Sequence, residues 1–168
     1  MKITLLRRAI LATLTLTFGL APVLADGAMA PAIARIGSLE ISDAFVRATL
    51  PGAKVGGAYL TITNKGSEAD RLVSVASPSA AAAQLHSMSV DGDVMKMRPV
   101  EGGVEIPAGK TVALTPSGFH VMFTGITAPF VKGRTVPLAL RFEKAGNIDL
   151  NLPVESAGAT SAMSGMAM

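Results

Sequence analysis

Short apolar runs separated by turn residues, repeated from Leu39 to Val154, restrict the possible folds of this chain more than any other feature. Apolar and polar side chains alternate within the runs. Leu60 and Ile62, for example, share one face of an extended segment, and the residues beside them share the other. Glycine, proline, asparagine and aspartate mark the turns in between. The pattern predicts a single all-β domain, built as a sandwich or a barrel.

The alternation also predicts where the strands lie. We expect strands over residues 40–49, 57–64, 70–77, 82–90, 94–100, 110–115, 120–124, 135–143 and 147–154. Residues 80–83 are four alanines in a row and are compatible with one helical turn. No internal repeat is present.

Both ends of the chain differ from this middle part. Residues 1–25 combine basic residues, an apolar run and small residues, the order of a secretory signal peptide cleaved after Ala25 or Ala30. The apolar run is shorter than the roughly 20 residues of a membrane-spanning helix, so an uncleaved anchor is the weaker interpretation. We predict a flexible lead-in over residues 26–38, a β-domain over 39–154 and a disordered tail over 155–168.

Removal of this signal peptide changes the net charge of the chain. Residues 1–25 carry three of the 15 basic residues and none of the 12 acidic ones, which leaves 12 of each sign. The balance gives no indication of binding to nucleic acid or to a membrane surface. We expect a periplasmic monomer with no membrane span after signal removal.

The absence of cysteine excludes several kinds of chemistry. Thiolate metal sites, cysteine nucleophiles, CxxC redox pairs and blue-copper centres all require a thiol. The chain also lacks the GxSxG, HExxH and P-loop motifs, so we do not expect an enzyme.

The histidines and methionines form the pattern that can carry chemistry. His86 and His120 are the two histidines, and each precedes a methionine by two residues, Met88 and Met122. On a strand, residues i and i+2 project from the same face, so each pair presents an imidazole beside a thioether. Met95-Lys96-Met97 lies between them, and Asp91-Gly92-Asp93 offers a turn that folds this pair back on the His86 strand.

This donor set favours a soft metal ion. Thioethers are soft and neutral and favour Cu(I), and neutral imidazole binds Cu(I) as well as other late metals. The few carboxylates nearby disfavour Ca²⁺ and Mg²⁺, and a methionine-rich set is a poor match for Zn²⁺. The alternative is that the methionines fill gaps in the core and the histidines are ordinary surface residues. The residues alone leave both interpretations open.

The spacing resembles the motif of the periplasmic PCuAC copper chaperones. That family has a histidine, ten residues, a methionine, about twenty-one residues and a His-x-Met pair. Here His86 is followed after ten residues by Met97, and after twenty-two more by His120 and Met122. The flanks at residues 70–73, 92–100 and 106–110 are also similar, and the likeness extends over about residues 39–154. Phe45 stands where the family often has tryptophan, which should alter packing rather than metal binding.

The resemblance implies a cupredoxin-like Greek-key β-sandwich or barrel that binds Cu(I) at an exposed site. It implies His86, Met97, His120 and Met122 as ligands, with Met88 and Met95 as secondary candidates. It also implies delivery of copper to the CuA centre of cytochrome c oxidase subunit II, alongside a Sco-type protein. Two other functions stay open: a copper buffer or resistance protein without a specific recipient, and a metal-free binding module. Met163, Met166 and Met168 in the tail are either idle or an auxiliary thioether arm.

Overall fold

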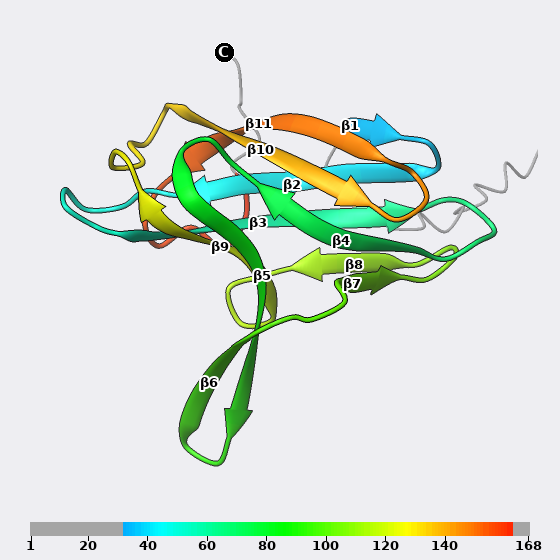
Figure 1. The fold of residues 1–168 in the computed structure, drawn as a ribbon, viewed down its shortest axis with the longest axis horizontal. Coiled ribbons are helices and arrows are strands. Elements are labelled where there is room, and N and C mark those ends of the chain that lie inside the picture. Colours follow the sequence, from blue (N-terminus) through cyan, green and yellow to red (C-terminus); the bar gives the residue numbers. More distant parts are fainter. Residues whose placement is uncertain (1–31, 163–168) are drawn as a thin grey trace, which may run out of the picture.

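The computed structural model describes residues 32–162, which form eleven strands and no helix (Figure 1). The strands are β1 (Ala32–Ile36), β2 (Leu39–Arg47), β3 (Val55–Asn64), β4 (Asp70–Ala76), β5 (Ala80–Asp91), β6 (Val94–Pro99), β7 (Val104–Ile106), β8 (Thr111–Leu114), β9 (Phe119–Ile126), β10 (Thr135–Phe142) and β11 (Asn147–Glu155). The predicted all-β domain is therefore confirmed. Within this part of the chain, no helix is long and apolar enough to cross a membrane.

All the strands belong to one sheet. Its order is β6-β5-β9-β3-β2-β11-β10-β4-β7, with β1 paired to β2 and β8 paired to β3. Every pairing is antiparallel except the short one between β11 and β2. The sheet curls so that β4 also contacts β5, which encloses the apolar core.

The core explains why the strands alternate. On β9, Val121 and Phe123 are fully buried in the core cluster, whereas His120 and Met122 project from the opposite face. Leu85 on β5 faces the core in the same way, and His86 faces outward. The core therefore fixes which side of the sheet the histidines occupy.

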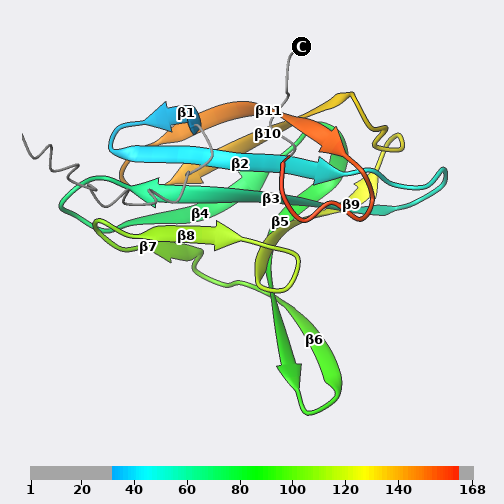
Figure 2. The same ribbon diagram turned by 180° about the vertical axis from the view of Figure 1, so that it is seen from behind.

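One part of the sheet extends beyond this core. The ends of β5 and β6 form a hairpin that projects from the body of the molecule in both views (Figures 1 and 2). The strands are joined at Gly92, whose φ of 62° lies in the left-handed region that glycine adopts readily. The hairpin predicted from Asp91-Gly92-Asp93 is confirmed, and it pairs residues 86–91 with residues 94–99.

The structure differs from the sequence-based expectations at three places. Residues 32–36 of the expected lead-in form β1, which pairs with β2 around Gly37. The alanines at 80–83 lie in β5 because pairing with β9 overrides the helix propensity of alanine. Part of the tail is held: Arg47 Nε donates to the carbonyl oxygen of Ala159, and Asp43 Oδ1 accepts from the Ala162 amide. The predicted signal peptide and residues 163–168 lie outside the described residues.

Candidate metal centre

The two histidines lie on neighbouring strands. β5 and β9 are antiparallel, and their register places His86 directly opposite His120. The ring centroids are 6.0 Å apart. The structure therefore brings together two imidazoles that are 34 positions apart in the sequence.

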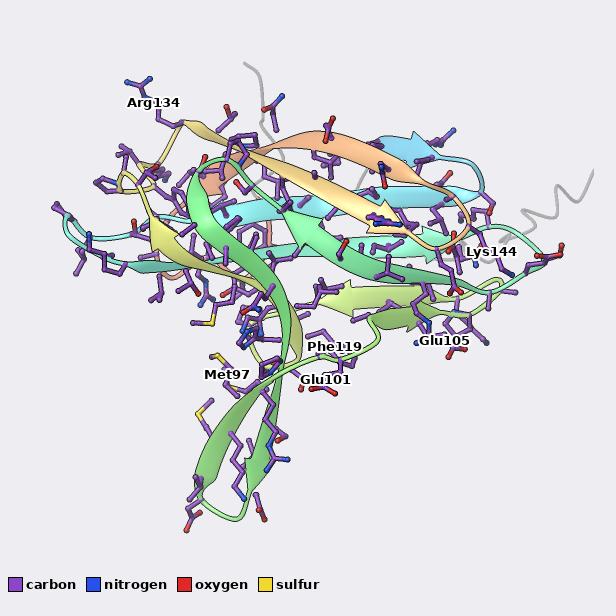
Figure 3. The ribbon with its side chains drawn as sticks, in the orientation of Figure 1. Met97, Glu101, Glu105, Phe119, Arg134 and Lys144 are labelled. Atoms are coloured by element: carbon purple, nitrogen blue, oxygen red, sulfur yellow. The ribbon has the colours of Figure 1, made fainter. Side chains whose placement is uncertain are left out.

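The thioethers flank this pair in register. Met122 lies two residues beyond His120 on β9, opposite Gln84. Met88 lies two residues beyond His86 on β5, opposite Met97 of β6. Residues that are directly opposite, or two positions along a strand, share a face of the sheet. All four side chains of the candidate ligand set therefore project from the same side, and Figure 3 shows Met97 where the hairpin leaves the body.

The environment of His120 determines which of its ring nitrogens can bind a metal ion. Its side chain is 5% exposed, and Nδ1 lies 3.2 Å from the carbonyl oxygen of Gly118. A carbonyl oxygen only accepts hydrogen bonds, so Nδ1 carries the proton. A neutral ring in this tautomer has its free electron pair on Nε2, which is the atom available to bind a metal ion.

His86 has no such partner. Both ring nitrogens are buried, and neither has a hydrogen-bond partner among the described residues. Burial lowers the pKa of His86 below its usual value, and the charge of a protonated His120 lowers it further. A neutral imidazole with an unused electron pair is the form that binds a metal ion.

The lowered pKa predicts how copper affinity responds to acid. The folded chain keeps His86 neutral below the ordinary imidazole pKa of about 6.5, so protons displace the ion only at lower pH. We expect Cu(I) affinity to fall as the pH drops through the imidazole range, and the contribution of His86 to be lost only below about pH 6.5. Chelator competition across this range measures the effect. Met97→Leu is the control, because a thioether does not titrate and its loss should leave the shape of the curve unchanged; constant affinity down to pH 5 would exclude both histidines as ligands.

A row of aromatic rings supports the histidine pair, and the sequence did not reveal it as part of the site. Next to His120 comes Tyr59 of β3 at 6.4 Å between centroids, and next to Tyr59 comes Phe45 of β2 at 5.1 Å. The guanidinium of Arg47 lies 5.1 Å from the centre of the Tyr59 ring. The alternation in β3 did place Tyr59 on the face opposite Leu60, but only the order β9-β3-β2 shows that this face continues the site.

The side chains near the histidines limit which metal ions the site can bind. Nowhere in residues 32–162 do three or more His, Cys, Asp or Glu side chains gather in a way that could hold a metal ion. Within this part of the chain, His86 and His120 therefore lack the carboxylate cluster that hard ions require, and the donors on their face of the sheet include the sulfurs of Met97 and Met122. Two imidazoles with thioethers suit a soft ion such as Cu(I), so the residues present fit the predicted cargo.

Solved structures of copper proteins share this fold. The copper-bound PCuAC domain from PmoF2 has a TM-score of 0.63 and 26% identity, covering 73% of this chain and 97% of that domain. The solution structure of CuI-DR1885 from Deinococcus radiodurans has a TM-score of 0.53 and 30% identity, covering 71% of this chain and 78% of that protein. The cupredoxin-like prediction is confirmed, and the fold and the site define the class: a PCuAC copper-chaperone domain.

The sequence comparison gives the family. Residues 39–154 match the family described as "Putative lipoprotein LpqE-like", and the chain belongs to this PCuAC-related family. A curated relative is "Putative lipoprotein Lxx21020" of Leifsonia xyli subsp. xyli (strain CTCB07). It is 31% identical over 117 residues, which are 70% of this chain and 69% of the relative.

Proposed function

We propose that this chain is an exported copper metallochaperone that carries one Cu(I) ion. The proposed ligands are His86, Met97, His120 and Met122. The proposed recipient is the CuA centre of cytochrome c oxidase subunit II, with a Sco-type protein acting alongside. The match to copper-bound PCuAC domains supports a copper-chaperone role, and the ligand set and the recipient extend it.

One observation carries the proposal. Within residues 32–162, neither buried ring nitrogen of His86 has a hydrogen-bond partner, and the ring lies beside a second imidazole whose tautomer leaves Nε2 free. An unpaired buried polar group costs stability, so such an arrangement needs a reason. A metal ion shared by the two rings supplies one, because it gives each histidine a partner when loaded.

The thioethers support copper in its reduced state. Met97 and Met122 are neutral and soft, and they add no anionic charge that would favour Cu(II). Such a site holds the ion less firmly than thiolates would, and an acceptor protein can replace its ligands one at a time.

The oxidation-state preference is testable by competition. We expect Cu(I) to bind more tightly than Cu(II), and the double variant Met97→Leu/Met122→Leu to weaken Cu(I) binding far more than Cu(II) binding. Leucine has a similar volume and lacks the thioether sulfur. Parallel chelator titrations with each oxidation state measure both affinities; Cu(II) binding as tight as Cu(I) binding at this site would contradict the proposal.

Delivery distinguishes a chaperone from a copper buffer. The loaded chain is mixed with the copper-free CuA domain of subunit II, with and without a Sco-type protein, and copper in the CuA domain is followed by its absorption. We expect transfer to be faster than from a small-molecule Cu(I) complex of equal affinity. Equal rates would favour the buffer function.

The location we propose is the periplasm. The lipoprotein-like relatives suggest an exported protein. The signal-like residues 1–25 agree with export.

A further inference from the structure

The projecting β5–β6 hairpin has two chemically different faces. The register pairs Met88 with Met97 and Val90 with Met95, without a shift, so these four residues continue outward from His86 on the same face. The opposite face is polar except for Val94, and there Lys96 forms an ion pair with Asp91. The hairpin therefore presents a face of three thioethers and one valine next to the histidine pair.

Packing does not explain these methionines. Methionine commonly fills gaps in a core, but the Met95 side chain is 65% exposed and Met97 is 45% exposed. Val90 beside them is 68% exposed, so no core lies over this face. Apolar side chains that are grouped on a solvent-exposed hairpin lower the solubility of a protein and add little to the stability of its fold. Their presence here indicates a use other than packing.

We propose that Met88, Met95 and Met97 form a second, outer Cu(I) station on the hairpin. The proposal rests on the proposed function, because Met97 is also a ligand of the histidine site. Met88 and Met97 are directly opposite, with Cβ atoms about 4.5–5.5 Å apart in such pairs, and Met95 is the diagonal neighbour of Met88 at about 7–8 Å. Each side chain has three rotatable bonds, so the three sulfurs can reach a common point.

The shared Met97 gives the two stations a simple connection. Met97 keeps its sulfur on the ion while Met88 and Met95 exchange with His86, His120 and Met122. The exchange moves no electron, and the copper stays Cu(I) throughout. The outer station lacks imidazole, so it is weaker than the inner one, and it holds the ion on the exposed part of the hairpin, where another protein can reach it.

The test follows each methionine methyl group in the full chain. Cu(I) is diamagnetic, so NMR of ¹³C-methyl methionine reports each thioether as copper is added. The first equivalent should move the Met97 and Met122 signals and the two imidazoles. The second should move Met88 and Met95 with at least tenfold weaker affinity, as Met97 passes to the outer ion and leaves the inner ion to His86, His120 and Met122. Met95 signals that stay unchanged at two equivalents would overturn the outer station.

Two variants make the comparison specific. Met95→Leu should keep the first equivalent and weaken the second at least tenfold. Val90→Leu alters the cross-strand partner of Met95 on the same face and should leave both equivalents unchanged. A second equivalent as strong in Met95→Leu as in the unaltered chain would overturn the proposal.

The two proposals fail in different ways. If the first equivalent leaves both imidazoles unchanged, the proposed function itself fails. If the first equivalent binds there and Met95 does not respond to the second, only the outer station fails. Because Met95 is exposed, its replacement should leave the fold intact, and far-ultraviolet circular dichroism checks this.

Discussion

Replacing His86 with leucine should remove copper binding and at the same time stabilise the copper-free chain. The variant loses one proposed ligand, and we expect the Cu(I) affinity to fall at least about 100-fold, since loss of even an outer-shell partner costs about 10–100-fold. It also removes two buried nitrogens that have no hydrogen-bond partner in the part of the chain that the structure describes. Relieving an unsatisfied buried group is worth about 1–3 kcal/mol, which predicts an increase of a few degrees in the melting temperature.

His120→Leu is the matched comparison. It should also lose copper binding, but it should lower the stability of the copper-free chain, whereas His86→Leu should raise it. Its Nδ1 donates to the Gly118 carbonyl, which also accepts from the Met88 amide, so the variant loses one hydrogen bond and should cost about 0.5–1.5 kcal/mol. Gln84 lies opposite Met122 on the neighbouring strand, and Gln84→Ala should change neither the copper affinity nor the stability. Chelator competition and thermal unfolding of the copper-free variants measure both effects. Copper affinity of His86→Leu within a few-fold of the unaltered chain would show that His86 is not a ligand.

Replacing Phe123 with alanine should have the largest effect on stability and little effect on the site. Phe123 is fully buried, and its ring packs edge-on against Phe130 with centroids 5.3 Å apart. Truncation of a core phenylalanine costs about 3–5 kcal/mol, because apolar contact is lost and a cavity stays behind. The free energy of unfolding from urea titration measures the cost.

The copper affinity of this variant tests whether the two faces of β9 are independent. Phe123 points into the core, whereas Met122 points to the opposite face. At a temperature where the variant stays folded, we expect Cu(I) affinity within about threefold of the unaltered chain, because sites without shared partners are nearly additive. A loss of more than tenfold in the folded variant would mean that the core side of the strand shapes the site.

Acid should act on the fold as well as on copper binding. His86 has a lower pKa in the folded chain than in the unfolded chain, so the unfolded chain takes up the proton first as the pH falls through about 6.5. The copper-free chain therefore loses stability over this range until the folded pKa is passed. His86→Leu removes this contribution, and its stability should vary less with pH there.

The period-two pattern predicted most of the sheet because core strands alternate between buried and exposed side chains. It missed β1 (Ala32–Ile36), which lies in a stretch without a clear period, and β7, which has only three residues. It left open a helical turn at the alanines of β5, since propensity is local and the partner strand is not. The missed segments are those whose structure depends on a neighbouring strand.

The candidate site was predictable in part. The turn at Gly92 was enough to pair Met97 with the His86 strand, because a hairpin is a local contact. The meeting of His86 with His120 depends on the non-local pairing of β5 with β9, which no turn signal specifies; the sequence indicated it only through the family resemblance. The aromatic row from His120 to Phe45 depends on the order of three strands, β9-β3-β2, and could not be predicted.

X-ray absorption at the copper edge, on the full chain loaded with one equivalent of Cu(I), tests the ligand set most directly. The account predicts a reduced ion bound by imidazole nitrogen and thioether sulfur together. It also predicts that the sulfur signal decreases in Met97→Leu/Met122→Leu and the imidazole signal decreases in His86→Leu. A first shell of nitrogen and oxygen without sulfur, or one that keeps its imidazole signal in His86→Leu, would contradict it.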